Sequence, residues 1–113
     1  MAVSYQKLKK PEFKRVFQLG KTIRAGFVFF KILKNKKNYS RLGWIVGTKV
    51  SKGSVQRNKI KRRLREILYG LYPNLLPGND IIVIALPQIL NQKYSDIKDD
   101  IIDCLKKAKI LSI

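Results

Sequence analysis

Residues 81–86 form an uninterrupted apolar run, Ile-Ile-Val-Ile-Ala-Leu, which Asp80 precedes and Pro87 ends. Successive side chains of a strand point to opposite faces, so a strand without polar alternation buries both of its faces. Such a strand belongs in the interior of a sheet that is covered on each side. At 113 residues the chain is long enough for one core of this kind and too short for two. We therefore expect residues 1–113 to form a single domain.

The remaining patterns predict helices and further strands around that strand. Pro11 is expected to open a short helix that Gly20 closes, and a second helix is expected over residues 55–70 after an N-cap at Ser54. Strand patterns cover residues 22–33 and 41–49, and a last helix follows Ser95 or Asn91. The order is α-β-β-β-α-β-α if a short strand precedes Phe27, and α-β-β-α-β-α if not. Either order predicts an α+β fold, a small mixed sheet with helices packed on it.

The second helix carries an unusual concentration of positive charge. Six of the nine residues from 57 to 65 are cationic, and Glu66 is the only acid in the run 57–66. At about 100° per residue, one arc of this helix is apolar and is formed by Ile60, Leu64, Ile67, Leu68 and Leu71. The adjoining arc is formed by Arg57, Asn58, Lys61, Arg62 and Arg65. A solvated helix normally mixes acids with its bases, so we expect a phosphate-bearing partner to supply the missing negative charge.

Composition supports a folded protein that binds nucleic acid. The formal net charge is +18, from 25 Lys and Arg against 7 Asp and Glu, while 45% of the residues are hydrophobic. This basic excess favours nucleic-acid binding over a solubility surface or a membrane-surface peptide. The single Cys104 excludes an internal disulfide and is expected in the core. Because no apolar run approaches 18 residues and the first residues lack a signal core, we expect a cytoplasmic, soluble protein.

The sequence offers no enzyme site of its own. It contains no histidine, which removes the usual general base and metal ligand. Asp96, Asp99, Asp100 and Asp103 could in principle gather as ligands of two metal ions, but interleaved lysines and the core stripe of the same segment argue against this. We therefore expect no catalytic residue and no metal ligand in the protein.

At this point the motifs resemble one family, the protein component of bacterial ribonuclease P. The resemblance extends from about residue 7 to residue 108, in the family's order and spacing. The basic motif is Arg57-Asn58-x-x-Lys61-Arg62-x-x-Arg65-Glu66, preceded by Lys49 and Ser54-Val55. The opening helix matches through Leu8-Lys9-Lys10-Pro11-Glu12-Phe13-Lys14-Arg15-Val16-Phe17-x-x-Gly20-Lys21, and the strands match through Phe27-Val28-x-Phe30 and Ile81–Ala85.

The resemblance implies a subunit of a ribonucleoprotein endonuclease (a hydrolase) that removes the 5′ leader from precursor tRNA. In that family the RNA subunit holds the catalytic Mg²⁺ and cleaves the phosphodiester, while the small protein is a non-catalytic accessory that binds the RNA and contacts the leader. The implied partners are the RNA subunit and precursor tRNA, without a membrane or a small-molecule substrate. The implied fold has a left-handed crossover around the basic helix, against the right-handed preference of such connections.

The resemblance also implies two sets of binding residues. The RNA subunit would be bound by Lys49, Arg57, Asn58, Lys61, Arg62 and Arg65. The leader would be bound in a cleft by Phe13, Lys14, Phe17 and Phe30. Periodicity alone favours the core for Phe13 and Phe17, since they share one helix face with Val16, and the family pattern shifts both toward the cleft wall.

Two departures from the family pattern and two competing functions remain. The loop 49–54 has Val50 where a second lysine is common and Lys52 where glycine is common, and Leu86 stands where arginine is frequent.

The alternative functions are a ribosomal protein or general RNA chaperone, and a free-standing nuclease. The first needs charge but not three clustered phenylalanines, and the second is opposed by the missing histidine.

Overall fold

The computed structural model describes residues 6–112 as a five-stranded mixed sheet with three α-helices. The strands are β1 (Gln6–Lys7), β2 (Lys21–Arg24), β3 (Val28–Lys34), β4 (Arg41–Ile45) and β5 (Asn79–Ala85), in the order β1-β4-β5-β3-β2. The helices are α1 (Lys10–Leu19), α2 (Ser54–Leu71) and α3 (Tyr94–Lys107), with 3-10 turns at Tyr72–Asn74 and Pro87–Ile89. The predicted α+β class and the order α-β-β-β-α-β-α are confirmed, with β1 added before α1.

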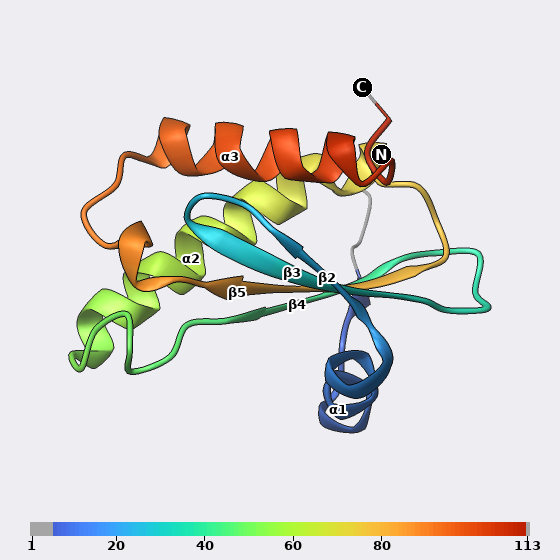
Figure 1. The fold of residues 1–113 in the computed structure, drawn as a ribbon, viewed down its shortest axis with the longest axis horizontal. Coiled ribbons are helices and arrows are strands. Elements are labelled where there is room, and N and C mark those ends of the chain that lie inside the picture. The colour runs from blue at the N-terminus through green and yellow to red at the C-terminus, as the bar shows by residue number, and fades with distance from the viewer. Residues whose placement is uncertain (1–5, 113) are drawn as a thin grey trace.

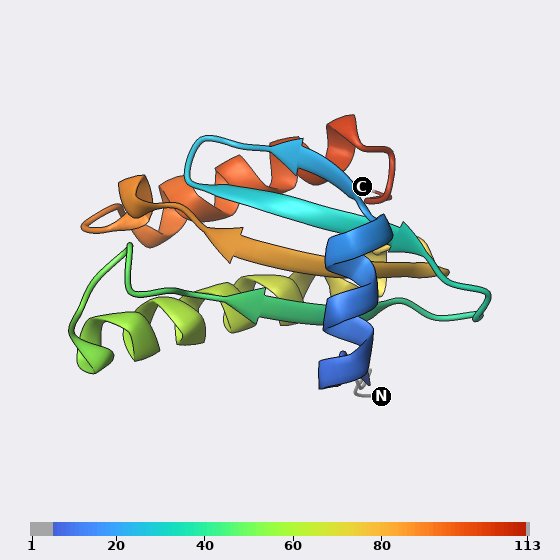
Figure 2. The same ribbon diagram turned by 60° about the horizontal axis from the view of Figure 1, so that its bottom comes forward.

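Strand β5 is buried on both faces, as its sequence predicts. It runs parallel to β4 and antiparallel to β3, in the middle of the sheet. Helix α1 crosses one face, and α2 with α3 covers the other (Figures 1 and 2). Ile81 and Val83 belong to the large core beneath α2 and α3, whereas Ile82 packs with Leu8 and Val16 beneath α1.

Helix α2 connects the two parallel strands through a left-handed crossover. From the α1 side, β4 and β5 run in the same direction and α2 returns behind the sheet (Figure 2). The apolar stripe predicted for this helix is buried, with every one of Ile60, Leu64, Ile67, Leu68 and Leu71 at most 5% exposed. The handedness agrees with the family resemblance, whereas the general preference of such connections is for the opposite hand.

Several element boundaries differ from the predictions for local reasons. The segment 22–33 is two strands, because a turn at Ala25–Phe27 separates β2 from β3. The Asp100 carboxylate of α3 holds this turn by accepting the backbone N–H groups of Gly26 (2.9 Å) and Phe27 (2.8 Å). Because the carboxylate that holds the turn is 73 residues away in the sequence, the local sequence does not predict the turn.

The segment around α2 also differs slightly. Strand β4 ends at Ile45 instead of residue 49, and the following loop is anchored by Val46 and Val50, which are buried in the core. The N-cap of α2 is Gly53 rather than Ser54, and the helix continues one residue past Gly70. Val50, which stands where a second lysine is common in the family pattern, is therefore a core contact.

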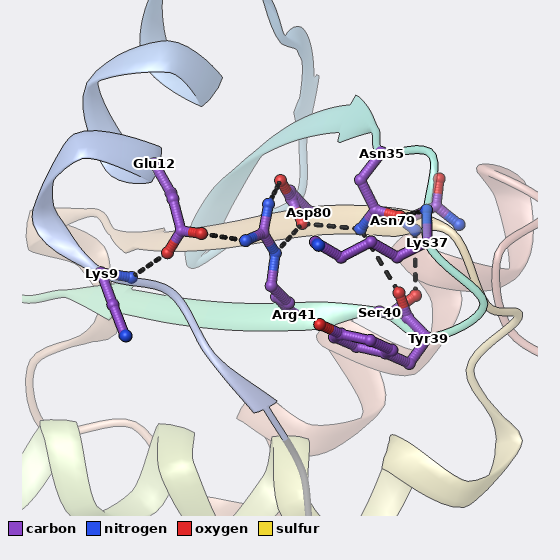
Figure 3. Close-up of polar contacts among 9 residues, drawn as sticks. All are labelled: Lys9, Glu12, Asn35, Lys37, Tyr39, Ser40, Arg41, Asn79 and Asp80. Atoms are coloured by element: carbon purple, nitrogen blue, oxygen red, sulfur yellow. Dashed lines mark hydrogen bonds and ion pairs between the residues drawn. The ribbon is translucent and has the colours of Figure 1, made fainter.

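A polar cluster ties α1 to the sheet (Figure 3). The Arg41 guanidinium donates through Nε to Asp80 Oδ1 at 2.8 Å and through Nη2 to Asp80 Oδ2 at 2.6 Å, and it also pairs with Glu12 of α1. The Arg41 side chain is only 14% exposed. Hydrogen bonding to Asp80 raises the pKa of Arg41, and burial opposes the rise only in part. Asn35 donates to Asp80 Oδ1 at 2.7 Å, which adds the β3–β4 loop to the cluster.

Helix α1 approaches the sheet closely at Gly43 of β4. A methyl group built on Gly43 would overlap the ring of Phe13, with the Cζ atom nearest. The phenyl ring therefore lies directly on the strand backbone, where any side chain would displace it. Gly43 permits this contact because it has no Cβ.

We expect Gly43→Ala to destabilise the fold by about 1–3 kcal/mol, because the new Cβ forces Phe13 and α1 away from the sheet. The matched control is Gly47→Ala, where a Cβ would meet no atom within 4 Å. That control should change the free energy of unfolding by no more than about 0.5 kcal/mol. Urea unfolding measures both variants, and equal losses would contradict the packing of Phe13 on Gly43.

Candidate RNA-binding surfaces

The predicted polar arc of α2 lies at the surface. Asn58, Arg62 and Arg65 are exposed, and Arg57 and Lys61 are partly exposed. Their guanidinium and ammonium groups follow one side of the helix because the buried stripe fixes its rotation on the sheet. We call these five residues the α2 basic face.

A groove runs beside this face, and sequence reasoning did not predict two of the residues that line it, Lys7 and Trp44. It holds about 270 Å³ and is lined by Lys7, Trp44, Asn58, Lys61, Arg62 and Arg65. The Lys7 ammonium lies 5.4 Å from the centre of the Trp44 ring, within cation–π range. Lys7 reaches this place because β1 pairs with β4 far along the chain. The sequence signals only that a lone tryptophan shares a strand face with Leu42.

Arg57 and Lys49 have different positions from the rest of the predicted set. Nη1 of Arg57 donates to the carbonyls of Ser51 (2.9 Å) and Lys52 (2.7 Å), so this residue fastens the loop that leads into α2. Both bonds use Nη1, which leaves the Nε and Nη2 edge of the guanidinium for a ligand. Lys49 is exposed in the same loop but does not line the groove.

A second candidate surface lies where α1 crosses the opposite face of the sheet. Val16 is fully buried and Phe13 partly buried against β4, while Phe17 is 37% exposed. At 100° per residue, Phe17 and Lys14 project from the side of α1 next to Phe13, and Arg15 projects from the other side. Phe13, Phe17 and Lys14 therefore lie on adjoining arcs of α1, with Phe13 as the buried end, and we call these three residues the α1 surface.

The prediction that Phe30 belongs to this surface is wrong. Phe30 is 0% exposed and packs in the core between the sheet and α2 and α3. It pairs with Val83, whereas its neighbour Phe29 pairs with Ile84 and so lies on the α1 face. Phe29 is partly exposed and takes the place expected for Phe30. The motif Phe-Val-Phe-Phe places aromatic side chains on both faces of the strand, so the sequence alone did not show whether Phe29 or Phe30 faces α1.

The described residues include neither a cluster of metal-ligating side chains nor an exposed cysteine. No group of three or more His, Cys, Asp or Glu side chains within the described range could hold a metal ion. Cys104 is buried in the core, and desolvation raises the pKa of its thiol, which disfavours a reactive thiolate. Among the helices in residues 6–112, none combines the length and the apolar character that crossing a membrane requires.

Comparison with known proteins identifies the family. The family model described as Ribonuclease P matches residues 2–109. A ribonuclease P protein component from Natranaerobius thermophilus is 35% identical over 103 residues, covering 91% of this chain and 89% of the relative. One from Lactobacillus johnsonii is 34% identical over 113 residues, covering 99% of this chain and 93% of the relative.

Solved structures agree with this similarity. The RNase P protein from Staphylococcus aureus has a TM-score of 0.84 and 30% identity, with 97% of this chain and 100% of that chain covered. The RNase P protein from Thermotoga maritima has a TM-score of 0.81 and 27% identity, with 90% and 96% covered. The chain belongs to the ribonuclease P protein family.

Proposed function

We propose that this protein is the accessory subunit of a ribonuclease P ribonucleoprotein and assists removal of the 5′ leader from precursor tRNA. The observation that carries the proposal is the α2 basic face, which presents cations without an interleaved acid on the surface of a protein of this family. RNA, with one negatively charged phosphate per nucleotide, is the kind of partner that such a surface binds favourably.

The α2 basic face would bind the RNA subunit. Arginine guanidinium groups donate pairs of parallel N–H groups to phosphate oxygens, and Arg62 and Arg65 are exposed for this purpose. Asn58 would add an amide contact to a base edge or a sugar. In the groove, the Trp44 ring beside Lys7 offers an apolar surface next to the cations.

The α1 surface would bind the leader. Phe17 on α1 and Phe29 on the same side of the sheet would present aromatic faces on which unpaired bases can stack, and the exposed Lys14 would bind the connecting phosphates. This surface and the α2 basic face lie on opposite sides of the sheet (Figure 2). The protein could therefore contact its RNA subunit and the leader at the same time.

Chemistry would remain with the RNA subunit. Mg²⁺ would be held by that RNA and the substrate, whose phosphate oxygens are ligands of the kind that Mg²⁺ prefers. The protein would help by neutralising phosphates and holding the substrate, which lowers the Mg²⁺ concentration needed for cleavage.

The experiment that tests this function is cleavage of a 5′-extended precursor tRNA by the cognate RNA subunit at low Mg²⁺, with and without the protein. Strong activation by the protein supports the proposal. Tight RNA binding without activation would instead favour a ribosomal or RNA-chaperone role. Cleavage by the protein alone, after rigorous removal of RNA, would show a nuclease in its own right.

Arg62→Ala should weaken binding to the RNA subunit and flatten its salt dependence. Loss of one phosphate contact should reduce the slope of log affinity against log salt by about 0.9. The matched control is Lys98→Ala, which removes an equal charge from an exposed position on α3, away from the α2 basic face. Equal slopes for the two variants would exclude a specific phosphate contact at Arg62.

Phe17→Ala should weaken binding of precursor tRNA by about 1–3 kcal/mol, the range for loss of one stacked base. Binding of mature tRNA, which lacks the leader, should not change. Leu19→Ala is the control, since Leu19 lies on the same helix and is 66% exposed. An equal loss for precursor and mature tRNA would assign Phe17 to the packing of α1 rather than to the leader.

A further inference from the structure

A third surface lies at the edge of the sheet formed by β2, far along the sheet order from β1 and the groove of α2. There, β2, β3 and the end of α3 enclose a hollow of about 760 Å³. Its floor is apolar and consists of Ile23, Ile32, Ala108 and Ile110. Its volume is in the range of pockets that hold small organic ligands. Neither the α2 basic face nor the α1 surface contributes to it.

Every charged residue that lines this hollow is a lysine or an arginine. Five bases line it, namely Lys21, Arg24, Lys34, Lys107 and Lys109. Asp100 and Asp103 line a smaller hollow that shares Arg24 and Lys107 with this one. Asp100 is engaged with the backbone of the β2–β3 turn. Most of the rim charge is therefore available to an anionic ligand.

Lys109 is held in a backbone conformation that favours glycine. Its φ is 61°, in the left-handed region. The end of α3 forms a Schellman motif, in which Ile110 N–H donates to Leu105 O at 3.2 Å and Lys109 N–H donates to Lys106 O at 3.0 Å. The position that usually carries glycine is thus occupied by a lysine, at a conformational cost. That lysine lines the hollow, which points to a ligand for its ammonium group.

We infer that this hollow binds single-stranded RNA, with a base on the apolar floor and the adjoining phosphates on the rim. An unpaired base has an exposed apolar face to place against Ile23 and Ile32, whereas a duplex keeps its bases stacked inside. The five Lys and Arg side chains of the rim supply contacts for the RNA phosphates on either side of that nucleobase. The site goes beyond the proposed function, because it needs neither the RNA subunit nor the leader cleft.

The first test is a titration of the ¹⁵N-labelled full chain with a short oligouridine, followed by two-dimensional NMR. Amide shifts at Ile23, Ile32, Ala108 and Ile110, separate from those on α2, support the site. Shifts confined to α1 and α2 would overturn it. Because the isolated protein is used, the result does not depend on activity in a ribonucleoprotein.

The second test separates binding from folding through Lys109→Gly. Glycine relieves the left-handed backbone, so the melting temperature should stay the same or rise, while affinity for the oligouridine should fall about fivefold at 0.1 M salt. The control Lys106→Ala removes an equal charge from an exposed residue of the last helical turn that does not line the hollow. Unchanged affinity in Lys109→Gly, or an equal fall in both variants, would overturn the proposal.

Discussion

The burial of β5 on both faces is the constraint on which the rest of the structure depends. Ile82 needs cover on one side and Ile81 and Val83 on the other, so a helix must pack on each face of the sheet. Helix α1 supplies one cover, and α2 and α3 supply the other. Because α2 is fixed by its apolar stripe, its rotation is set and its cations face outward. The position of the basic face follows from the core.

The few acids of the chain reinforce this arrangement. Three of the seven Asp and Glu residues, Glu12, Asp80 and Asp100, bind groups inside the fold. Glu12 and Asp80 share Arg41 and so connect α1, β4 and β5, while Asp100 connects α3 to the β2–β3 turn. These carboxylates are engaged within the protein, which leaves the outward surfaces strongly positive. An excess of charge of this kind raises self-repulsion in the free protein and favours a polyanionic partner.

The sequence predicted those parts of the fold that have a local signal. The apolar run of β5, the stripe of α2 and the end of α1 before Gly20 are local patterns that agree with the structure, while the helix predicted to open at Pro11 begins one residue earlier, at Lys10. Pairing of β1 with β4 and the hold of Asp100 on the turn at residues 25–27 are long-range contacts that no local pattern carries. The left-handed crossover came from family resemblance, since elementary geometry favours the opposite hand.

The candidate sites follow the same division. The α2 arc was predictable because helical periodicity assigns each residue to a side. The choice between Phe29 and Phe30 was not predictable, because both faces of β3 carry apolar side chains. Only the pairing of β3 with β5 decides which phenylalanine is buried. Lys7 and Trp44 meet only through the sheet.

We propose that opposite sides of one sheet contact two different RNAs, and site-specific cross-linking would test this arrangement. The buried Cys104 is poorly reactive, so single cysteines can be added at Asn58 on α2, Lys14 on α1 and, as a control, Lys98 on α3. Each would carry a photoactivated cross-linker in the complex with the RNA subunit and precursor tRNA. We expect position 58 to cross-link to the RNA subunit and position 14 to cross-link to the leader. Cross-links from both positions to the same RNA would contradict it.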